Sequence, residues 1–265
     1  LVEIDNNRDS NQIEFSIDGT DLEWLWITYH SPEVLSENQK NYLFNQIENI
    51  KQLIYTEDKS SKEWENLVDI SSLAKFYIIH EVVDHLEGFL GSCYLYKDRE
   101  DTKWKFGPVW DLGNAFNNYH DKDKFIYQES PFPVSIINEI VKFPDFQQEV
   151  QNIWNEYYPV IMDDIDVFIR NFANQIAHAS VCDAERWPNY GDTDVNNSSS
   201  EVISILQKKL SWLNSQWSIN NSINTVQSTN KYAENYYDLL GRRMLTPRKK
   251  GLYILNEIYP NGLVK

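Results

Sequence analysis

The run FYIIHEVVDHLEGFLGSCYLYKDREDTKWKFGPVWDLGNAF, residues 76–116, decides the fold that we predict for this chain. Its opening part belongs to a crowded apolar pattern over residues 73–89, which predicts a largely buried helix ending near two glycines. Two strand-like stretches, 92–97 and 103–110, follow on either side of a charged turn and predict a β-hairpin. The hairpin leads directly into the turn Asp111-Leu112-Gly113.

The residues before this run predict a sheet edge and a helix. Residues 1–33 alternate apolar and polar side chains and are rich in β-branched and aromatic residues, which favours two or three strands. Ser36 and Gln39 form a capping-box pattern, and apolar residues then recur at helical spacing, so a helix is predicted over residues 37–55. Ser71 and Ser72 are candidate caps of the next helix.

The residues after the run are predominantly helical in pattern. From Pro133 onward, apolar residues recur every three or four positions. This spacing predicts a bundle whose helices cover residues 134–143, 145–158, 160–180 and 201–217, with a turn-rich loop over residues 182–200. Beyond it, we expect a polar linker at 218–230 and a small β module at 231–265. The fold class is therefore α+β.

Composition limits what the protein does. The 265 residues carry 24 basic and 40 acidic side chains, a formal net charge of −16 that repels nucleic acid. No apolar run approaches the roughly 18 residues of a membrane span, so the chain is not expected to cross a membrane. Because the chain begins at Leu1 and resembles the inside of a domain there, we expect an upstream part to be missing.

Asp84 and Asp111 are the residues most suited to chemistry. Phosphoryl transfer needs one carboxylate to orient or deprotonate the acceptor and another to hold the magnesium ion that bridges the nucleotide phosphates. Asp84 lies at the end of the buried helix and Asp111 follows the hairpin, an order that agrees with kinase folds. Spacing alone leaves open that both are merely caps or solubilising residues.

Residues 76–116 also resemble the core signature of the CotH kinase family, named for spore-coat protein H. The shared features are an aspartate after a helix, the Tyr94-Leu95-Tyr96 strand with Lys-Asp, and the Gly-Pro-Val-Trp-Asp turn that ends at Asp111. The resemblance extends over residues 1–217 and implies an atypical protein-kinase-like fold. It implies ATP and Mg as cofactors, Asp84 as catalytic residue, Asp111 as magnesium ligand, and a protein hydroxyl as acceptor.

Asn114 and Ser92 are the remaining residues that this resemblance points to. It implies that Asn114 supports the metal or the phosphates. Ser92 stands where active family members carry an asparagine, and a hydroxyl is a weaker magnesium ligand than an amide oxygen. The family's upstream lobe would precede Leu1. Two functions therefore stay open: an exported kinase, or a non-catalytic pseudokinase of the cell surface or coat that binds protein or glycan partners.

The last segment, YYDLLGRRMLTPRKKGLYIL at residues 236–255, resembles the small β module that ends many secreted proteins of gram-negative anaerobes. In those proteins a Gly-Arg-Arg turn, a proline and a Lys-Gly-Leu-Tyr-Ile stretch follow one another. This likeness implies a secreted or cell-surface protein of a bacterium.

Other residue types predict no further site. His80 and His85 are five residues apart and should not stack as a metal pair on a helix, and His120 is best interpreted as a loop residue. Cys93 and Cys182 are interpreted as two buried thiols, with a single disulfide as the alternative. The acidic run at 163–166 lacks the spacing of a calcium loop and indicates a solvated helix face.

The aromatic residues allow one alternative. Most of the 9 tryptophans and 16 tyrosines are expected in the core. Trp24, Trp26 and Trp187 are the candidates for a carbohydrate-stacking surface, because two lie on an alternating strand and one in a loop.

Overall fold

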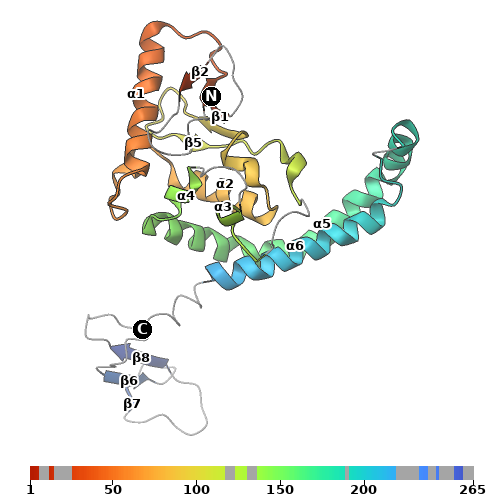
Figure 1. The fold of residues 1–265 in the computed structure, drawn as a ribbon. Coiled ribbons are helices and arrows are strands. Elements are labelled where there is room, and N and C mark those ends of the chain that lie inside the picture. Colours follow the sequence, from red (N-terminus) through yellow and green to blue (C-terminus); the bar gives the residue numbers. More distant parts are fainter. Residues whose placement is uncertain are drawn as a thin grey trace. The chain divides into compact units, whose positions relative to one another are not determined.

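The computed structural model describes residues 1–5, 12–14, 26–116, 123–129, 136–188, 191–218, 233–237, 243–244 and 254–258. The chain forms two compact units, Leu1–Ile219 and Asn220–Lys265. The strands of the first unit are β1 (Val2–Asp5), β2 (Gln12–Glu14), β3 (Trp26–Tyr29), β4 (Cys93–Tyr96) and β5 (Lys105–Phe106). Its helices are α1 (Glu37–Ile54), α2 (Ile70–Val82), α3 (Ile126–Glu129), α4 (Ile137–Ile140), α5 (Pro144–Arg186) and α6 (Val195–Trp217), with short 3-10 turns η1 (Glu63–Asn66), η2 (Leu86–Phe89) and η3 (Leu112–Asn114). Figure 1 shows this arrangement.

The strands of the first unit form one antiparallel sheet in the order β2-β3-β1-β4-β5. β1 lies at its centre, where Ile4 pairs with Ile27 on one side and with Cys93 on the other. All three side chains are buried, since a central strand packs apolar residues against its neighbours. Both the strands expected before residue 33, as far as they are described, and the β4–β5 hairpin are confirmed. Together with the helices, the sheet confirms the α+β class.

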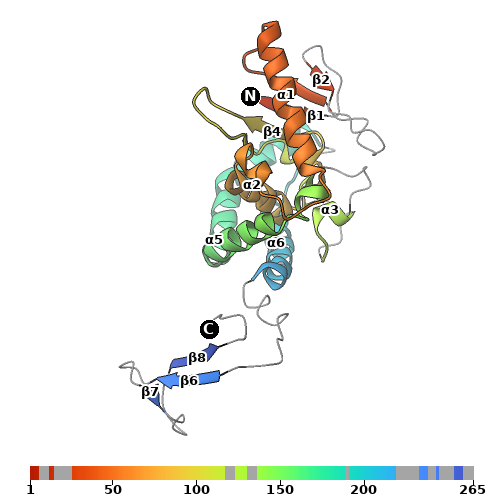
Figure 2. The ribbon, with the colours of Figure 1, turned by 90° about the vertical axis from the view of Figure 1, so that its left-hand side faces the viewer.

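Helix α1 begins and ends where the sequence predicts. The Ser36 hydroxyl caps the amide of Gln39, and the Gln39 side chain accepts from the Ser36 amide at 2.9 Å, which completes the capping box. The buried face of α1 joins the same apolar cluster as the sheet. In Figures 1 and 2, α1 lies along one side of this sheet. The Lys97 ammonium donates to Tyr42 and Gln46 and so ties the end of β4 to α1.

Helix α2 differs from the prediction at both ends. Its N-cap is Asp69, not Ser71 or Ser72, because the Asp69 amide donates to the Trp104 carbonyl at 2.8 Å and places its carboxylate over the Ser72 amide. At the other end, the helix stops at Val82 instead of continuing to residue 89. The next residues leave the helical path at Asp84, which has a φ of 55°, and the Val83 carbonyl accepts from the backbone amide of Phe116. This is a long-range contact that local periodicity does not report.

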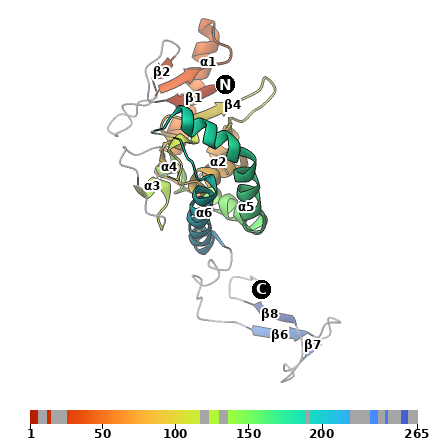
Figure 3. The same ribbon diagram turned by 90° about the vertical axis from the view of Figure 1, so that its right-hand side faces the viewer.

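Helix α5 is a single helix where two were predicted. It runs through Pro159, an interior position where proline removes one backbone hydrogen bond. Packing sustains the helix, because α6 runs back along it and α2 packs on it (Figures 1 and 3). The predicted loop at 182–200 shrinks accordingly, since α5 continues to Arg186 and α6 starts at Val195. None of the described helices combines the length and apolar character that crossing a membrane requires.

The second unit contains three described strands, β6 (Ala233–Tyr237), β7 (Arg243–Met244) and β8 (Ile254–Ile258). They pair antiparallel in the order β7-β6-β8. Most of the segment that resembles a secretion module, and nearly all of the predicted linker, lie outside the described residues.

Replacing Pro159 by alanine should stabilise the protein, because alanine restores the missing backbone donor inside α5. We expect the free energy of unfolding to rise by up to about 3 kcal/mol. Urea titration followed by circular dichroism measures it. Pro144→Ala is the matched control, since Pro144 occupies the first turn of the same helix, where proline is tolerated. An unchanged or lower stability of Pro159→Ala would contradict this account of α5.

Candidate active site

Two strained turns carry the aspartates that the sequence singles out. Asp84 follows α2 with a φ of 55°, and Asp111 follows the hairpin with a φ of 53°. Phe116, at the end of the second turn, has a φ of 58°. Non-glycine residues rarely adopt this left-handed conformation, and such strain gathers at functional sites. These three residues are the only non-glycine residues with positive φ in the described parts of the chain.

The two turns lie side by side. The backbone amide of Phe116 donates to the Val83 carbonyl at 2.9 Å. The side-chain amide of Asn114 donates to the Glu87 carboxylate at 2.7 Å. Burial lowers the pKa of His85, and the nearby carboxylates of Glu87 and Asp111 oppose that lowering. The structure thus brings the Asp84 turn together with Asp111 and Asn114.

Asp84 and Asp111 have different surroundings. Asp84 is 2% exposed, and its Oδ1 lies 3.4 Å from the Lys209 ammonium. Asp111 is exposed, and its side chain makes no capping hydrogen bond to the η3 turn that it precedes. One carboxylate is therefore enclosed beside a cation and the other faces solvent.

Lys209 is the residue that our sequence analysis missed. It is 1% exposed and lies between two carboxylates, with its Nζ 3.5 Å from Glu81 Oε2 and 3.4 Å from Asp84 Oδ1. Its Nζ also donates to the Lys124 carbonyl at 2.6 Å. A signal was present in the sequence: Lys209 is three residues after Leu206 and four before Leu213, which places it on the apolar face of α6.

Glu81 completes the buried network. Both of its oxygens accept from the Ile126 amide at 3.1 Å, and the Tyr77 hydroxyl donates to it. Burial raises the pKa of Glu81 to about 7, although the Lys209 ammonium opposes the rise. Near neutral pH, Glu81 is therefore present both with and without its proton. The Lys209 ammonium also lies beside a second carboxylate, that of Asp84.

The rings of His80 and His85 are stacked, a contact that the sequence did not predict. Their Nδ1 atoms are 2.9 Å apart and their ring planes differ by 28°. The contact is possible because α2 ends between the two residues, so helical spacing does not apply to them. Burial lowers the pKa of His80 to about 3, and neither Nε2 atom has a hydrogen-bond partner among the described residues. A Cβ on Gly88 would lie 2.3 Å from His80 Nδ1, so the pair also requires this glycine.

Most of the chain matches a known protein family. A family model described as CotH kinase protein matches residues 5–213, which include both turns and Lys209. The chain belongs to the CotH kinase family. Searches among curated proteins and among solved structures gave no match.

The donor set of this CotH-family chain suits magnesium that is held jointly with phosphates. Within the described residues, no group of three or more His, Cys, Asp or Glu side chains could hold a metal by itself. Mg²⁺ is commonly bound by one or two carboxylates, with the substrate's phosphates and water supplying the other ligands. The exposed carboxylate of Asp111 fits that mode. Ser92 is 3% exposed immediately before β4, and its part in the site stays a prediction.

The remaining candidate residues are two cysteines, three tryptophans, one histidine and an acidic run. Cys93 is buried as predicted, whereas Cys182 is exposed, and both are free thiols, which excludes a disulfide between them. Trp187 is 53% exposed at the end of α5, and Trp26 is half-buried in β3. Trp24 and His120 fall outside the described residues. In the acidic run, Asp163 and Asp164 are exposed on α5, as expected of a solvated helix face.

Replacing Lys209 by methionine should destabilise the protein strongly. The change leaves the carboxylates of Glu81 and Asp84 buried without their cation, a loss of about 3–5 kcal/mol in the free energy of unfolding. Lys208→Met is the matched control, because Lys208 is exposed on the same helix and should change stability by less than about 0.5 kcal/mol. Chemical denaturation measures both, and equal effects would contradict the buried network.

The stability of the protein should fall between pH 4.5 and 7 through Glu81. Its folded pKa of about 7 lies above its ordinary value of 4.5, so in this window the folded state binds more protons than the unfolded state. The contribution is lost as pH rises, by about 3 kcal/mol in total. Since His80 titrates with the opposite sign, the measurement is the stability difference between wild type and Glu81→Gln at pH 5 and pH 8. Parallel pH profiles would contradict the raised pKa.

Proposed function

We propose that the protein transfers the γ-phosphoryl group of ATP to a hydroxyl group of a protein, with Asp84 orienting or deprotonating the acceptor and Asp111 holding Mg²⁺. One observation carries the proposal: two left-handed aspartates occupy turns that are hydrogen-bonded side by side, one enclosed beside a lysine and the other exposed. A kinase-like arrangement of the α+β fold is part of the same proposal, supported by the family match over residues 5–213.

The surroundings of Asp84 suit a residue that acts on a bound hydroxyl group. At 2% exposure it is shielded from bulk water, which favours transfer to a positioned acceptor over hydrolysis. The Lys209 ammonium compensates the negative charge of the Asp84 carboxylate. It would also offset negative charge that develops when phosphate oxygens approach.

The second turn suits a metal and phosphate site. Magnesium, when bound with ATP, supplies charge neutralisation at the phosphate oxygens. The Asp111 carboxylate is the residue that would hold it. Asn114 directs its amide nitrogen at Glu87, which leaves the amide oxygen as an acceptor suited to a metal or its water. We propose supporting roles for Asn114 and Ser92.

We also propose that the protein is exported to the bacterial cell surface or secreted. The support is the resemblance of residues 236–255 to the β module that ends secreted proteins, together with the antiparallel strands β6, β7 and β8 in this region.

Calorimetric titration of the full-length natural protein with ATP in Mg²⁺ tests the function. We expect binding that requires Mg²⁺ and that weakens at least about tenfold in Asp111→Asn, because one ligand of the metal is lost. Asp98→Asn, in the exposed turn of the hairpin, should bind like wild type. Asp84→Asn should keep ATP binding and lose phosphate transfer, measured with radiolabelled ATP. If wild type binds no ATP, the non-catalytic alternative, a pseudokinase that binds surface partners, replaces this proposal.

A further inference from the structure

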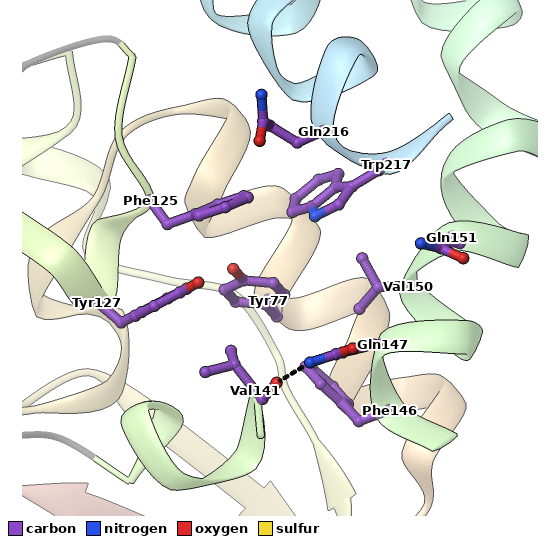
Figure 4. Close-up of a pocket in the computed structure, with 10 residues that line it drawn as sticks. All are labelled: Tyr77, Phe125, Tyr127, Val141, Phe146, Gln147, Val150, Gln151, Gln216 and Trp217. Atoms are coloured by element: carbon purple, nitrogen blue, oxygen red, sulfur yellow. Dashed lines mark hydrogen bonds between the residues drawn. The ribbon is translucent and has the colours of Figure 1, made fainter. Parts of the chain in front are cut away.

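A small cavity lies between α2, α3, α5 and α6, and it meets the buried network at Tyr77, which is hydrogen-bonded to Glu81. It has a volume of about 200 Å³ (Figure 4). Its walls are largely aromatic, and the aromatic residues are Tyr77, Phe125, Tyr127, Phe146 and Trp217. In the view of Figure 4, Phe125 and Tyr127 lie on one side of Tyr77, and Val150 and Gln151 on the other. None of its lining residues belongs to the Asp111 turn or to the proposed phosphate site.

The aromatic rings are held in defined orientations. Phe125 stacks on Tyr127 with ring centroids 5.3 Å apart and on Trp217 at 5.7 Å. The ring of Tyr77 also packs against Trp217, with ring centroids 5.8 Å apart. The hydroxyl of Tyr77 is engaged by Glu81, which fixes the ring further. Tyr77, Phe146 and Trp217 are buried, so the ring area that a ligand can stack on comes mainly from the half-buried Phe125 and Tyr127.

The polar groups of the cavity are amides and not charges. Gln147, Gln151 and Gln216 line it, and no charged side chain does. Each glutamine amide carries two N–H donors and an acceptor oxygen, so it can pair with a hydroxyl group in either direction. The Gln147 amide donates to the Val141 carbonyl at 2.7 Å, which fixes its position (Figure 4). Donors and acceptors of this kind match a neutral ligand rich in hydroxyl groups.

The size of the cavity indicates how much of a ligand it can enclose. A cavity of about 150 Å³ holds a benzene ring. The 200 Å³ available here therefore accommodates one six-membered ring with its substituents. A nucleotide does not suit the cavity, because its phosphates would meet no cation among the lining residues.

We propose that this cavity binds a single neutral pyranose sugar residue, stacked on the aromatic rings and hydrogen-bonded by Gln147, Gln151 and Gln216. The site uses none of the three tryptophans that the sequence suggested for glycan binding. It goes beyond phosphoryl transfer and does not depend on it, because no lining residue has a role in that reaction.

Saturation-transfer NMR and calorimetry with methyl glucopyranoside, methyl galactopyranoside and methyl mannopyranoside test the proposal. We expect at least one of them to bind at millimolar concentration and to quench tryptophan fluorescence through Trp217. Gln216→Ala should weaken binding about fivefold, the effect of one lost hydrogen bond. Gln207→Ala, an exposed glutamine on the same helix that does not line the cavity, should bind like wild type.

Phe125→Leu provides a second variant, which keeps apolar volume but removes the stacking face. It should weaken binding while circular dichroism shows an unchanged fold. Three results would overturn the proposal: no binding of any of the three glycosides, equal binding by wild type and Gln216→Ala, or binding of indole in place of the glycosides. Loss of ATP binding in Asp111→Asn with glycoside binding retained would show that the two sites are separate.

Discussion

The ammonium group of Lys209, buried between Glu81 and Asp84, is the interaction on which the rest of the structure depends. It joins α6 to the end of α2 and, through the Lys124 carbonyl, to the chain just before α3. Burying an ammonium and two carboxylates is costly unless each is paired and hydrogen-bonded. Here the tyrosine hydroxyl, the Ile126 amide and the lysine provide those partners, so any rearrangement of α6 would leave charges unpaired.

This network allows the strained turns to persist. Left-handed aspartates are disfavoured by the backbone, so the surrounding contacts must hold Asp84 and Asp111 in place. The backbone amide of Phe116 donates to Val83 and the side-chain amide of Asn114 donates to Glu87, and these two hydrogen bonds hold the turns together. The result brings one enclosed and one exposed carboxylate into neighbouring turns, and the proposed phosphoryl transfer rests on this arrangement.

Several features could be predicted because they depend on neighbours in the chain. The capping box of Ser36 and Gln39 positions the start of α1, and the turn between β4 and β5 follows from charged residues between two apolar runs. The Asp111-Leu112-Gly113 turn was predicted with its candidate aspartate for the same reason. The wrong predictions concern features set by distant partners. The cap of α2 moves to Asp69 through a contact with Trp104, and α5 continues through Pro159 because α6 and α2 pack on it.

The sequence by itself therefore determined the α+β class, the membership of the CotH family, the helix α1, the hairpin and the two aspartates as candidates. Each of these rests on side-chain periodicity, local capping or a contiguous motif. Only the tertiary structure decided where α2 ends, that His80 and His85 stack, and that Lys209 lies beside Asp84. Asp84 and Lys209 are 125 residues apart, so their contact is decided by the packing of whole helices. Local pattern carries no information about which buried carboxylate a lysine will meet.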